Sequence, residues 1–227
     1  MAPLTELQLA ELGRIPSPTI ANAVETFHVR PRLEGCTDAS IRCLFPELGA
    51  MVGYASTLAI LSNQPAPPRR RVNRREYWEN MRAQPGPLIV VAQDLGDTPG
   101  GAYWGEVNSS IHKKLGAIGV LTNGTVRDLD EVRALGFHFF ASGVQVSHGW
   151  AHLEDFDRPV RVFGMTVHPG DLIHADKHGA VVIPAEIAAE TAAAARKIDD
   201  SERPMLALCR APELDLDALD RLISPDY

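Results

Sequence analysis

Three ionisable residues stand at the two ends of one stretch of this sequence. Glu106 follows a glycine-rich run, and the neighbours Arg127 and Asp128 follow the segment 122–125, which reads Thr-Asn-Gly-Thr. An arginine presents a planar fork that matches a carboxylate bidentately. An adjacent aspartate supplies a hard oxygen ligand for Mg²⁺ or Mn²⁺. Such a pair suits a substrate that carries a carboxylate next to a metal-chelating carbonyl, that is, a 2-oxo acid.

Two further groups belong to this hypothesis. Glu106 could bind the same metal ion or polarise one of its water molecules. The backbone N–H groups that follow Glu106 lie at the start of an expected helix, which is a ready anion site. A structural alternative stays open, in which Arg127 and Asp128 form a surface ion pair that caps the next helix.

The elements around these residues must bring them together. The pattern predicts a helix over residues 107–115, an apolar strand that ends at Leu121, a tight turn over 122–125 and a helix over 129–135 that Gly136 ends. Ligands bind at the carboxyl ends of the strands in open α/β sheets. We therefore expect Glu106 and the Arg127–Asp128 pair to meet at that end.

The remaining chain indicates an α/β fold in which an antiparallel element packs beside a parallel part. Before the central stretch we expect helices over 4–12 and from Ser17, strands over 41–44 and 51–59, a helix over 74–84 and a strand over 88–92 that ends near Asp94. After it we expect a strand over 137–141, a loop over 142–152, a hairpin over 159–167, paired strands within 172–183, an Ala-rich helix over 185–200 and an amphipathic segment over 214–223. Gly53 within its strand suggests a bulge or a close backbone approach.

Several polar residues outside the central stretch have open roles. His148 and His152 are four residues apart and could bind metal, contact substrate or serve a structural or interface role. Asn22 could point towards the site or into solvent. The basic cluster could be a solvated loop, an anion- or partner-binding loop, or a nucleic-acid contact; its members are Arg69, Arg70, Arg71, Arg74 and Arg75.

Composition narrows the class of protein. The 227 residues are 45% hydrophobic and 22% charged, which is typical of one large globular domain, with or without appendages. The net charge of −7 argues against non-specific nucleic-acid binding. The sparse set Cys36, Cys43 and Cys209 fits a reducing compartment better than a disulfide framework. Cys36 and Cys43 could be adjacent, but we expect them to be buried thiols. We find no span or signal-peptide pattern, and expect a cytoplasmic protein without a membrane partner.

The central stretch resembles the RraA-like family. That family contains 4-hydroxy-4-methyl-2-oxoglutarate and 4-carboxy-4-hydroxy-2-oxoadipate aldolases, together with regulators of ribonuclease E activity. The residues that carry the resemblance are Gly105-Glu106, Gly124-Thr-Val-Arg127-Asp128, Asp130-Glu131 and Gly136-Phe-His-Phe-Phe-Ala141. Segments 17–23 and 167–184 also look like the family, so the resemblance covers about residues 15 to 200.

The resemblance implies a swivelling β/β/α domain with mixed sheets and flanking helices. Residues 1–227 would form one such domain with N-terminal helices and a C-terminal helical extension from about residue 185. Family members usually assemble as trimers or hexamers with active sites at subunit interfaces. We therefore expect a homotrimer or a homohexamer.

The resemblance also implies roles for individual residues. Asp128 would ligate Mg²⁺ (or Mn²⁺), and Glu106 would bind the metal or orient its water. Arg127 would bind the pyruvyl group and stabilise its enolate. The amides of Val107 and Asn108 would bind the substrate carboxylate. Apart from the resemblance, we also count Gly105 and His148 among the candidate substrate-binding residues.

Three positions depart from the family pattern. Asn22 stands where the early helix usually has an aspartate, and residues 107–110 are more polar than usual. Glu202 is a candidate for the acidic residue that characterised aldolases take from a neighbouring subunit. These departures affect the prediction of which substrate is bound more than the prediction of the site for the metal and the pyruvyl group.

The function that we predict is a divalent-metal-dependent lyase. It would cleave a 4-hydroxy-2-oxo acid by a retro-aldol reaction to give pyruvate, and the same enolate chemistry would decarboxylate oxaloacetate. The alternative is a non-catalytic regulator that binds a ribonuclease or helicase. A quinone methyltransferase has little support, because we find no Gly-rich nucleotide loop with an acidic ribose ligand.

Overall fold

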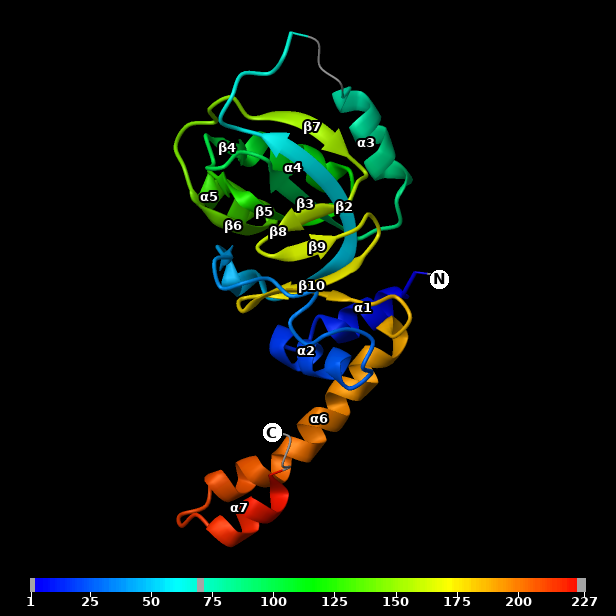
Figure 1. Ribbon diagram of the computed structural model, residues 1–227, viewed down its shortest axis with the longest axis vertical. Helices are drawn as coiled ribbons and strands as arrows, with labels where there is room; N and C mark the ends of the chain where they lie inside the picture. The colour runs from blue at the N-terminus through cyan, green and yellow to red at the C-terminus, as the bar shows by residue number, and fades with distance from the viewer. Residues whose placement is uncertain (1–2, 69–71, 224–227) are drawn as a thin grey trace.

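A computed structural model describes residues 3–68 and 72–223 of the chain. Its centre is a nine-stranded mixed sheet with the order β1-β6-β5-β3-β2-β10-β11, in which β4 also pairs with β5 and β7 with β2. Figure 1 shows this sheet as a curved body with helices around it. The strands are β1 (Arg42–Cys43), β2 (Met51–Leu61), β3 (Leu88–Asp94), β4 (Ala102–Trp104), β5 (Ala117–Val126), β6 (His138–Val144), β7 (His152–Phe156), β10 (Leu172–Asp176) and β11 (Gly179–Ile183). A separate hairpin consists of β8 (Val160–Val162) and β9 (Met165–Val167).

Parallel and antiparallel pairs share the one sheet. Strands β2, β3, β5 and β6 run parallel to one another, and β4 runs parallel to β5, whereas β1 pairs antiparallel with β6. Strand β2 is long enough to pair antiparallel with β10 near its start and with β7 near its end. The expected antiparallel element therefore continues the sheet, and the swivelling β/β/α architecture with flanking helices is confirmed.

The central strand β3 is buried on both faces, as parallel strands usually are. Alternate side chains enter two different cores, because successive residues of a strand point to opposite faces. Val90 packs in the larger core beneath the helices, whereas Ile89 and Val91 pack in the smaller core beneath the β8–β9 hairpin. Both cores together fix the carboxyl ends of β3 and β5.

The helices lie around this sheet and beyond it. They are α1 (Glu6–Leu12), α2 (Ser17–Glu25), α3 (Arg74–Ala83), α4 (Glu106–Lys114), α5 (Leu129–Leu135), α6 (Ala188–Cys209) and α7 (Leu216–Leu222), with a short 3₁₀ turn, η1 (Pro46–Leu48). Thr5 forms a capping box with Gln8 at the start of α1. The end of α6 and all of α7 project from the body (Figure 1).

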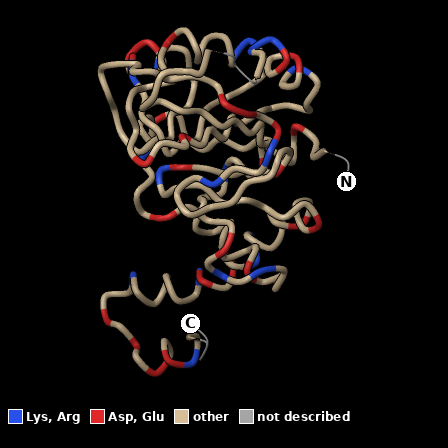
Figure 2. The backbone as a smooth tube through the Cα atoms, turned by 45° about the horizontal axis from the view of Figure 1, so that its top comes forward, with Lys and Arg blue, Asp and Glu red and all other residues tan. Residues whose placement is uncertain are grey.

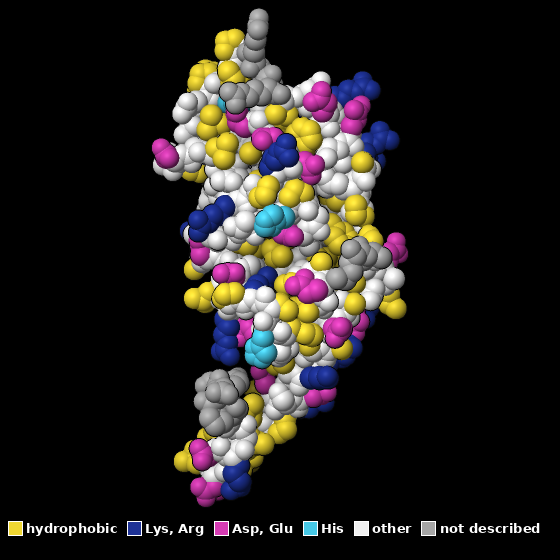
Figure 3. All heavy atoms as spheres, turned by 45° about the vertical axis from the view of Figure 1, so that its right-hand side comes forward, with side chains coloured by type: hydrophobic (Ala, Val, Ile, Leu, Met, Phe, Trp, Pro, Cys, Tyr) yellow, Lys and Arg dark blue, Asp and Glu magenta, His cyan; other side chains and the backbone are white. Residues whose placement is uncertain are grey.

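The projecting segment exposes apolar side chains between charged ones, as Figure 3 shows. Its exposed apolar residues are Leu206, Leu214, Leu216, Leu222 and Ile223. Acidic and basic positions are interspersed over the whole chain, this segment included (Figure 2). Helix α6 also runs through Pro204 to Cys209, well past the end that we expected near residue 200. It starts at Ala188 instead of Ala185, because residues 184–187 form a turn in which the Ile187 amide donates to the Pro184 carbonyl.

The predicted tight turn at residues 122–125 is wrong. Strand β5 continues to Val126, and the segment is an irregularity in its pairing with β6. The side chain of Asn123 replaces two strand hydrogen bonds: its Oδ1 accepts from the Asp94 amide at 2.7 Å, and its Nδ2 donates to the Asp94 carbonyl at 2.9 Å. The strand therefore passes the polar segment without reversing direction.

Two other local expectations need correction. The expected loop over 142–152 is shorter, because β6 extends to Val144 and β7 begins at His152. Cys36 and Cys43 are half-buried free thiols, so the expectation that they are buried holds only in part, and Cys209 is exposed. None of the helices within residues 3–68 and 72–223 is both long and apolar enough to cross a membrane.

Candidate functional site

The end of β5 turns sharply and presents Arg127 and Asp128. The Arg127 amide donates to the Trp104 carbonyl at 2.9 Å, which holds the ends of β4 and β5 together. Asp128 follows with a left-handed backbone (φ 55°), a conformation that aspartate tolerates better than most residues. Its carboxylate makes no cap hydrogen bond to α5. The structural alternative is therefore met in part: Arg127 and Asp128 form a partly exposed ion pair and Asp128 is the N-cap residue of α5, but its side chain does not cap that helix.

The Asp128 carboxylate instead faces the start of α4. Its Oδ2 accepts a hydrogen bond from the Glu106 amide at 2.9 Å and lies 3.8 Å from Arg127 Nε. Gly105 permits this approach, because a Cβ at Gly105 would lie 2.4 Å from Asp128 Oδ2. The sequence pattern that joins Gly105-Glu106 to Arg127-Asp128 thus corresponds to direct contact between the two segments.

The first turn of α4 leaves backbone donors unused. The Ser109 amide donates to the Gly105 carbonyl at 3.0 Å and is the first intrahelical donor, so the amides of Val107 and Asn108 before it have no acceptor within the helix. The Asn108 side chain is fixed, because its Nδ2 donates to the Tyr103 carbonyl. These amides form a positive helix end beside Arg127, which favours an anion there.

A hollow of about 240 Å³ lies over these groups. Its lining comes from the start of α3, β4 and the start of α4, the end of β5 and the loop before β7: Arg74, Ala102, Tyr103, Gly105, Val107, Asn108, Arg127, Asp128, His148 and Ala151. Sequence reasoning predicted six of these as site residues, namely Gly105, Val107, Asn108, Arg127, Asp128 and His148. The side chain of Glu106 is exposed and does not line the hollow, although its amide binds Asp128.

His148 and His152 lie in different surroundings, one at the hollow and the other within β7. His148 lines the hollow, and its loop packs closely on Gly101, where a Cβ would lie 2.3 Å from the His148 carbonyl carbon. The Ala102 amide fixes the same loop by donating to the Ser147 carbonyl at 2.8 Å. His152 is buried in β7, with Nε2 2.7 Å from Glu154 Oε1. The pair therefore does not converge on one metal ion.

A buried aromatic cluster supports α4 from below. His112 Nδ1 lies 2.6 Å from the Asn108 carbonyl, and Nε2 lies 3.0 Å from the Tyr77 hydroxyl. A carbonyl only accepts, so Nδ1 carries the proton and Nε2 accepts from Tyr77. Burial lowers the pKa of His112 to about 4, and burial also raises the pKa of Tyr77 well above its ordinary value. The neutral imidazole thus joins α3 to the first turn of α4.

Sequence reasoning missed three lining residues entirely and Arg74 in part. Ala102, Tyr103 and Ala151 carried no chemical signal, and Arg74 was singled out only as a member of the basic cluster. Of that cluster, Arg69, Arg70 and Arg71 lie outside the described residues. Asn22 is exposed on α2, which packs against α6, β10 and β11 and not against the elements of the hollow.

The donor set limits which metal the hollow could hold. Within the described part of the chain, no three His, Cys, Asp or Glu side chains lie together as a metal cluster. Asp128 lines the hollow and contacts the Glu106 amide and Arg127 through Oδ2, so Oδ1 is the oxygen that could serve as a hard ligand. Mg²⁺ is commonly held by one or two carboxylates, with waters and substrate as its other ligands. The residues present therefore fit Mg²⁺ or Mn²⁺ held in this way, and do not fit an all-protein metal cage.

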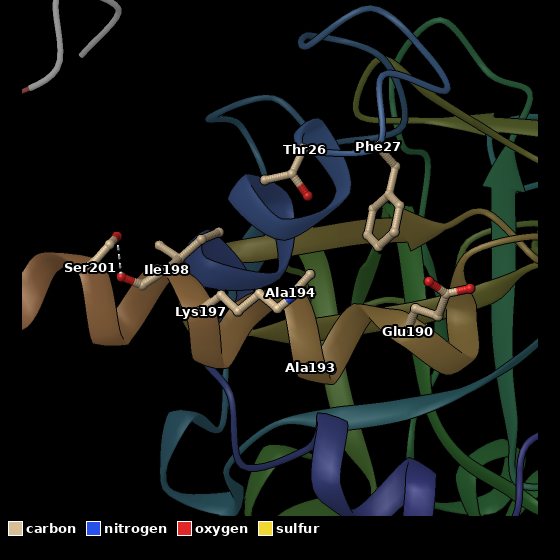
Figure 4. Close-up of a pocket in the computed structure, with 8 residues that line it drawn as sticks. All are labelled: Thr26, Phe27, Glu190, Ala193, Ala194, Lys197, Ile198 and Ser201. Atoms are coloured by element: carbon tan, nitrogen blue, oxygen red, sulfur yellow. Dashed lines mark hydrogen bonds between the residues drawn. The ribbon is translucent and has the colours of Figure 1, made fainter.

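A larger hollow of about 420 Å³ lies between α6 and the residues just after α2 (Figure 4). Its lining consists of Thr26, Phe27, Glu190, Ala193, Ala194, Lys197, Ile198 and Ser201. Glu190 and Lys197 are its only charged residues, and they stand two helical turns apart on α6. Among its described lining residues there is no adjacent acid and base and no cluster of metal ligands, so we assign the catalytic chemistry to the smaller hollow.

Comparisons with known proteins identify the family and the fold of this chain. An uncharacterised protein of Methanocaldococcus jannaschii is 36% identical over 120 residues, which cover 51% of this chain and 56% of that protein, so the match spans little more than half of its length. A protein of Halalkalibacterium halodurans, provisionally named a 4-hydroxy-4-methyl-2-oxoglutarate aldolase, is 28% identical over 63% of this chain and 71% of its own. The solved structure of Streptomyces coelicolor RraAS2, titled an unusual member of the RNase ES inhibitor RraA family, superposes with a TM-score of 0.69 at 24% identity. That match covers 93% of this chain and 100% of RraAS2, and it shows a shared fold. The family model described as RraA-like, Aldolase/RraA, matches residues 18–182, and the chain therefore belongs to the RraA-like family.

Proposed function

We propose that this protein is a divalent-metal-dependent lyase that cleaves a 4-hydroxy-2-oxo acid to give pyruvate and also decarboxylates oxaloacetate. One observation carries the proposal. Arg127, Asp128 and the free amides of α4 line a single hollow, and each corresponds to a group that binding and cleavage of a 2-oxo acid require. A distant relative's name points to the same substrate class.

The residues of the hollow have separate roles in binding the substrate and the metal ion. The amides of Val107 and Asn108 and the guanidinium of Arg127 bind the substrate carboxylate. Asp128 holds Mg²⁺ or Mn²⁺, and the bound ion supplies Lewis-acid polarisation of the 2-oxo group. The Glu106 amide keeps the Asp128 carboxylate oriented through its 2.9 Å hydrogen bond.

Cleavage of the C3–C4 bond moves an electron pair onto the 2-oxo oxygen. Arg127 lies beside that oxygen in this binding mode and stabilises its growing negative charge. The hydroxyl proton on C4 leaves at the same time, and Glu106 is the proposed acceptor through water, because its backbone amide contacts Asp128 and its side chain is exposed to solvent. Protonation at C3 then releases pyruvate. In oxaloacetate, loss of CO₂ takes the place of the carbonyl product.

The rival proposal is a non-catalytic regulator that binds a ribonuclease or helicase. The fold does not decide between them, because one fold hosts both kinds of function. The convergence of Arg127 and Asp128 on a hollow favours the lyase, since a protein that only binds a partner has no need of a metal-ligating carboxylate beside an anion site.

The test is pyruvate release coupled to lactate dehydrogenase, measured for Arg127→Ala and Asp128→Asn. The Asn variant keeps the shape of the side chain and removes its charge. We expect kcat/KM to fall by at least about 100-fold in each, because both groups act on the developing charge. Asp130→Asn is the matched control, since Asp130 is a 91% exposed aspartate two residues further along the chain. Wild-type activity in Arg127→Ala or Asp128→Asn would overturn the assignment.

A further inference from the structure

The mechanism above leaves one charged residue of the hollow without a role. Arg74 lines the same hollow as Arg127 and comes from a different element, the first residue of α3. One substrate carboxylate would bind Arg127 and the α4 amides. The guanidinium of Arg74 would then have no anionic partner among the described residues of the hollow.

The charge of Arg74 is available to a ligand. Its neighbour Arg75 pairs with Glu79, with Nε 2.8 Å from Oε1. Arg74 has no acidic partner among the residues that the structure describes. The Asn73 side chain accepts from the Arg75 amide at 2.8 Å and thereby fixes the start of α3. Arg74 therefore stands at the edge of the hollow as an unpaired guanidinium on an ordered helix end.

The position of Arg74 is tied to the anion site of α4. Tyr77, one helical turn after Arg74, is fully buried, and its hydroxyl donates to His112 Nε2. His112 in turn donates to the carbonyl of Asn108 in the first turn of α4. These hydrogen bonds connect α3, which carries Arg74, to the first turn of α4, which carries the anion-binding amides.

We propose that Arg74 binds a second carboxylate and so makes the hollow selective for dicarboxylic 2-oxo acids. The inference rests on the proposed function for the class of ligand. Charge balance supports it: two guanidinium groups and the positive end of α4 face a single carboxylate, Asp128. The volume of about 240 Å³ suits a small organic acid, because it lies below the range of pockets that hold drug-sized molecules.

Binding measurements on matched ligands test this role without turnover. The probes are 2-oxoglutarate and 2-oxopentanoate, which share a five-carbon 2-oxo chain and differ in the second carboxylate. Calorimetry with Mg²⁺ present would compare the wild type with Arg74→Gln, and with Arg75→Gln as the control from the adjacent ion-paired arginine. We expect the wild type to prefer 2-oxoglutarate by about 10- to 100-fold, the range of a charge-assisted hydrogen bond. Arg74→Gln should lose that preference and keep 2-oxopentanoate affinity within about twofold, whereas Arg75→Gln should keep the preference.

The outcomes separate this inference from the proposed function. A retained preference in Arg74→Gln, an equal loss for both ligands, or no binding of 2-oxoglutarate by the wild type would overturn it. Arg74→Lys keeps the charge, and partial recovery of the preference would exclude a purely structural effect. If the preference depends on Arg74 but no substrate releases pyruvate, the lyase proposal alone fails. If pyruvate is released but the preference ignores Arg74, the role of Arg74 alone fails.

Discussion

Replacing Gly105 by alanine tests the contact that joins the two halves of the site. The new Cβ would lie 2.4 Å from Asp128 Oδ2, and it would also lie 3.1 Å from Arg127 Cγ. Ordinary van der Waals contact begins at 3.4 Å, so the carboxylate must move by about 1 Å (3.4 − 2.4 Å). A shift of that size breaks the 2.9 Å hydrogen bond from the Glu106 amide and moves Oδ1 away from its position in the hollow.

The expected effect is on catalysis more than on folding. A misplacement of about 1 Å costs on the order of 100-fold in rate when groups must be aligned. The backbone itself tolerates alanine, because Gly105 has an extended conformation (φ −158°). The Asp128 side chain is 39% exposed, so we expect a stability loss of only about 1 kcal/mol.

The assay combines kcat/KM for pyruvate release with thermal unfolding. Gly143→Ala on β6 is the matched control, because a Cβ there would meet nothing within 4 Å. We expect Gly105→Ala to lose about 100-fold in kcat/KM and Gly143→Ala to keep the wild-type value. Wild-type kcat/KM in Gly105→Ala would refute the link between this contact and the chemistry.

Two further predictions concern stability. Unfolding restores the pKa of His112 from about 4 to 6.5, so below 6.5 the unfolded chain binds a proton that the folded chain excludes. Stability should therefore fall by up to about 3 kcal/mol as pH drops from 6.5 to about 4, and urea unfolding of His112→Gln should show a weaker fall than the wild type; an identical pH dependence in both would contradict this. Gly53→Ala would place a Cβ 2.6 Å from the Pro87 carbonyl oxygen, which is backbone and cannot rotate away. We expect urea unfolding to show a loss of about 1 to 3 kcal/mol, and an unchanged midpoint would show that β2 and β3 separate more easily than the contact suggests.

The sequence predicted the elements of the site better than their final geometry. Apolar runs and glycines located β3, β5 and α5, including the stop at Gly136, whose φ of 63° favours glycine. The close approach expected at Gly53 is also present. These features are local, so residue type and spacing suffice to find them.

Other features depend on contacts between distant segments. The strand continues past residue 122 because Asn123 pairs with the backbone of Asp94, 29 residues away. Asp128 turns towards α4 because Glu106 offers an amide and Gly105 leaves room. Arg74 reaches the hollow only through the packing of α3. No spacing rule along the chain encodes these approaches, which is why sequence reasoning grouped Arg74 with a basic loop.

Pyruvate release by the wild-type protein tests the central claim most directly. Oxaloacetate and 4-hydroxy-4-methyl-2-oxoglutarate would be supplied in turn, with Mg²⁺ and with EDTA, and pyruvate would be followed through lactate dehydrogenase. The proposed lyase predicts release from at least one substrate with Mg²⁺ and its loss in EDTA. No release from either substrate, together with a stoichiometric ribonuclease or helicase partner, would contradict the lyase and favour the regulator.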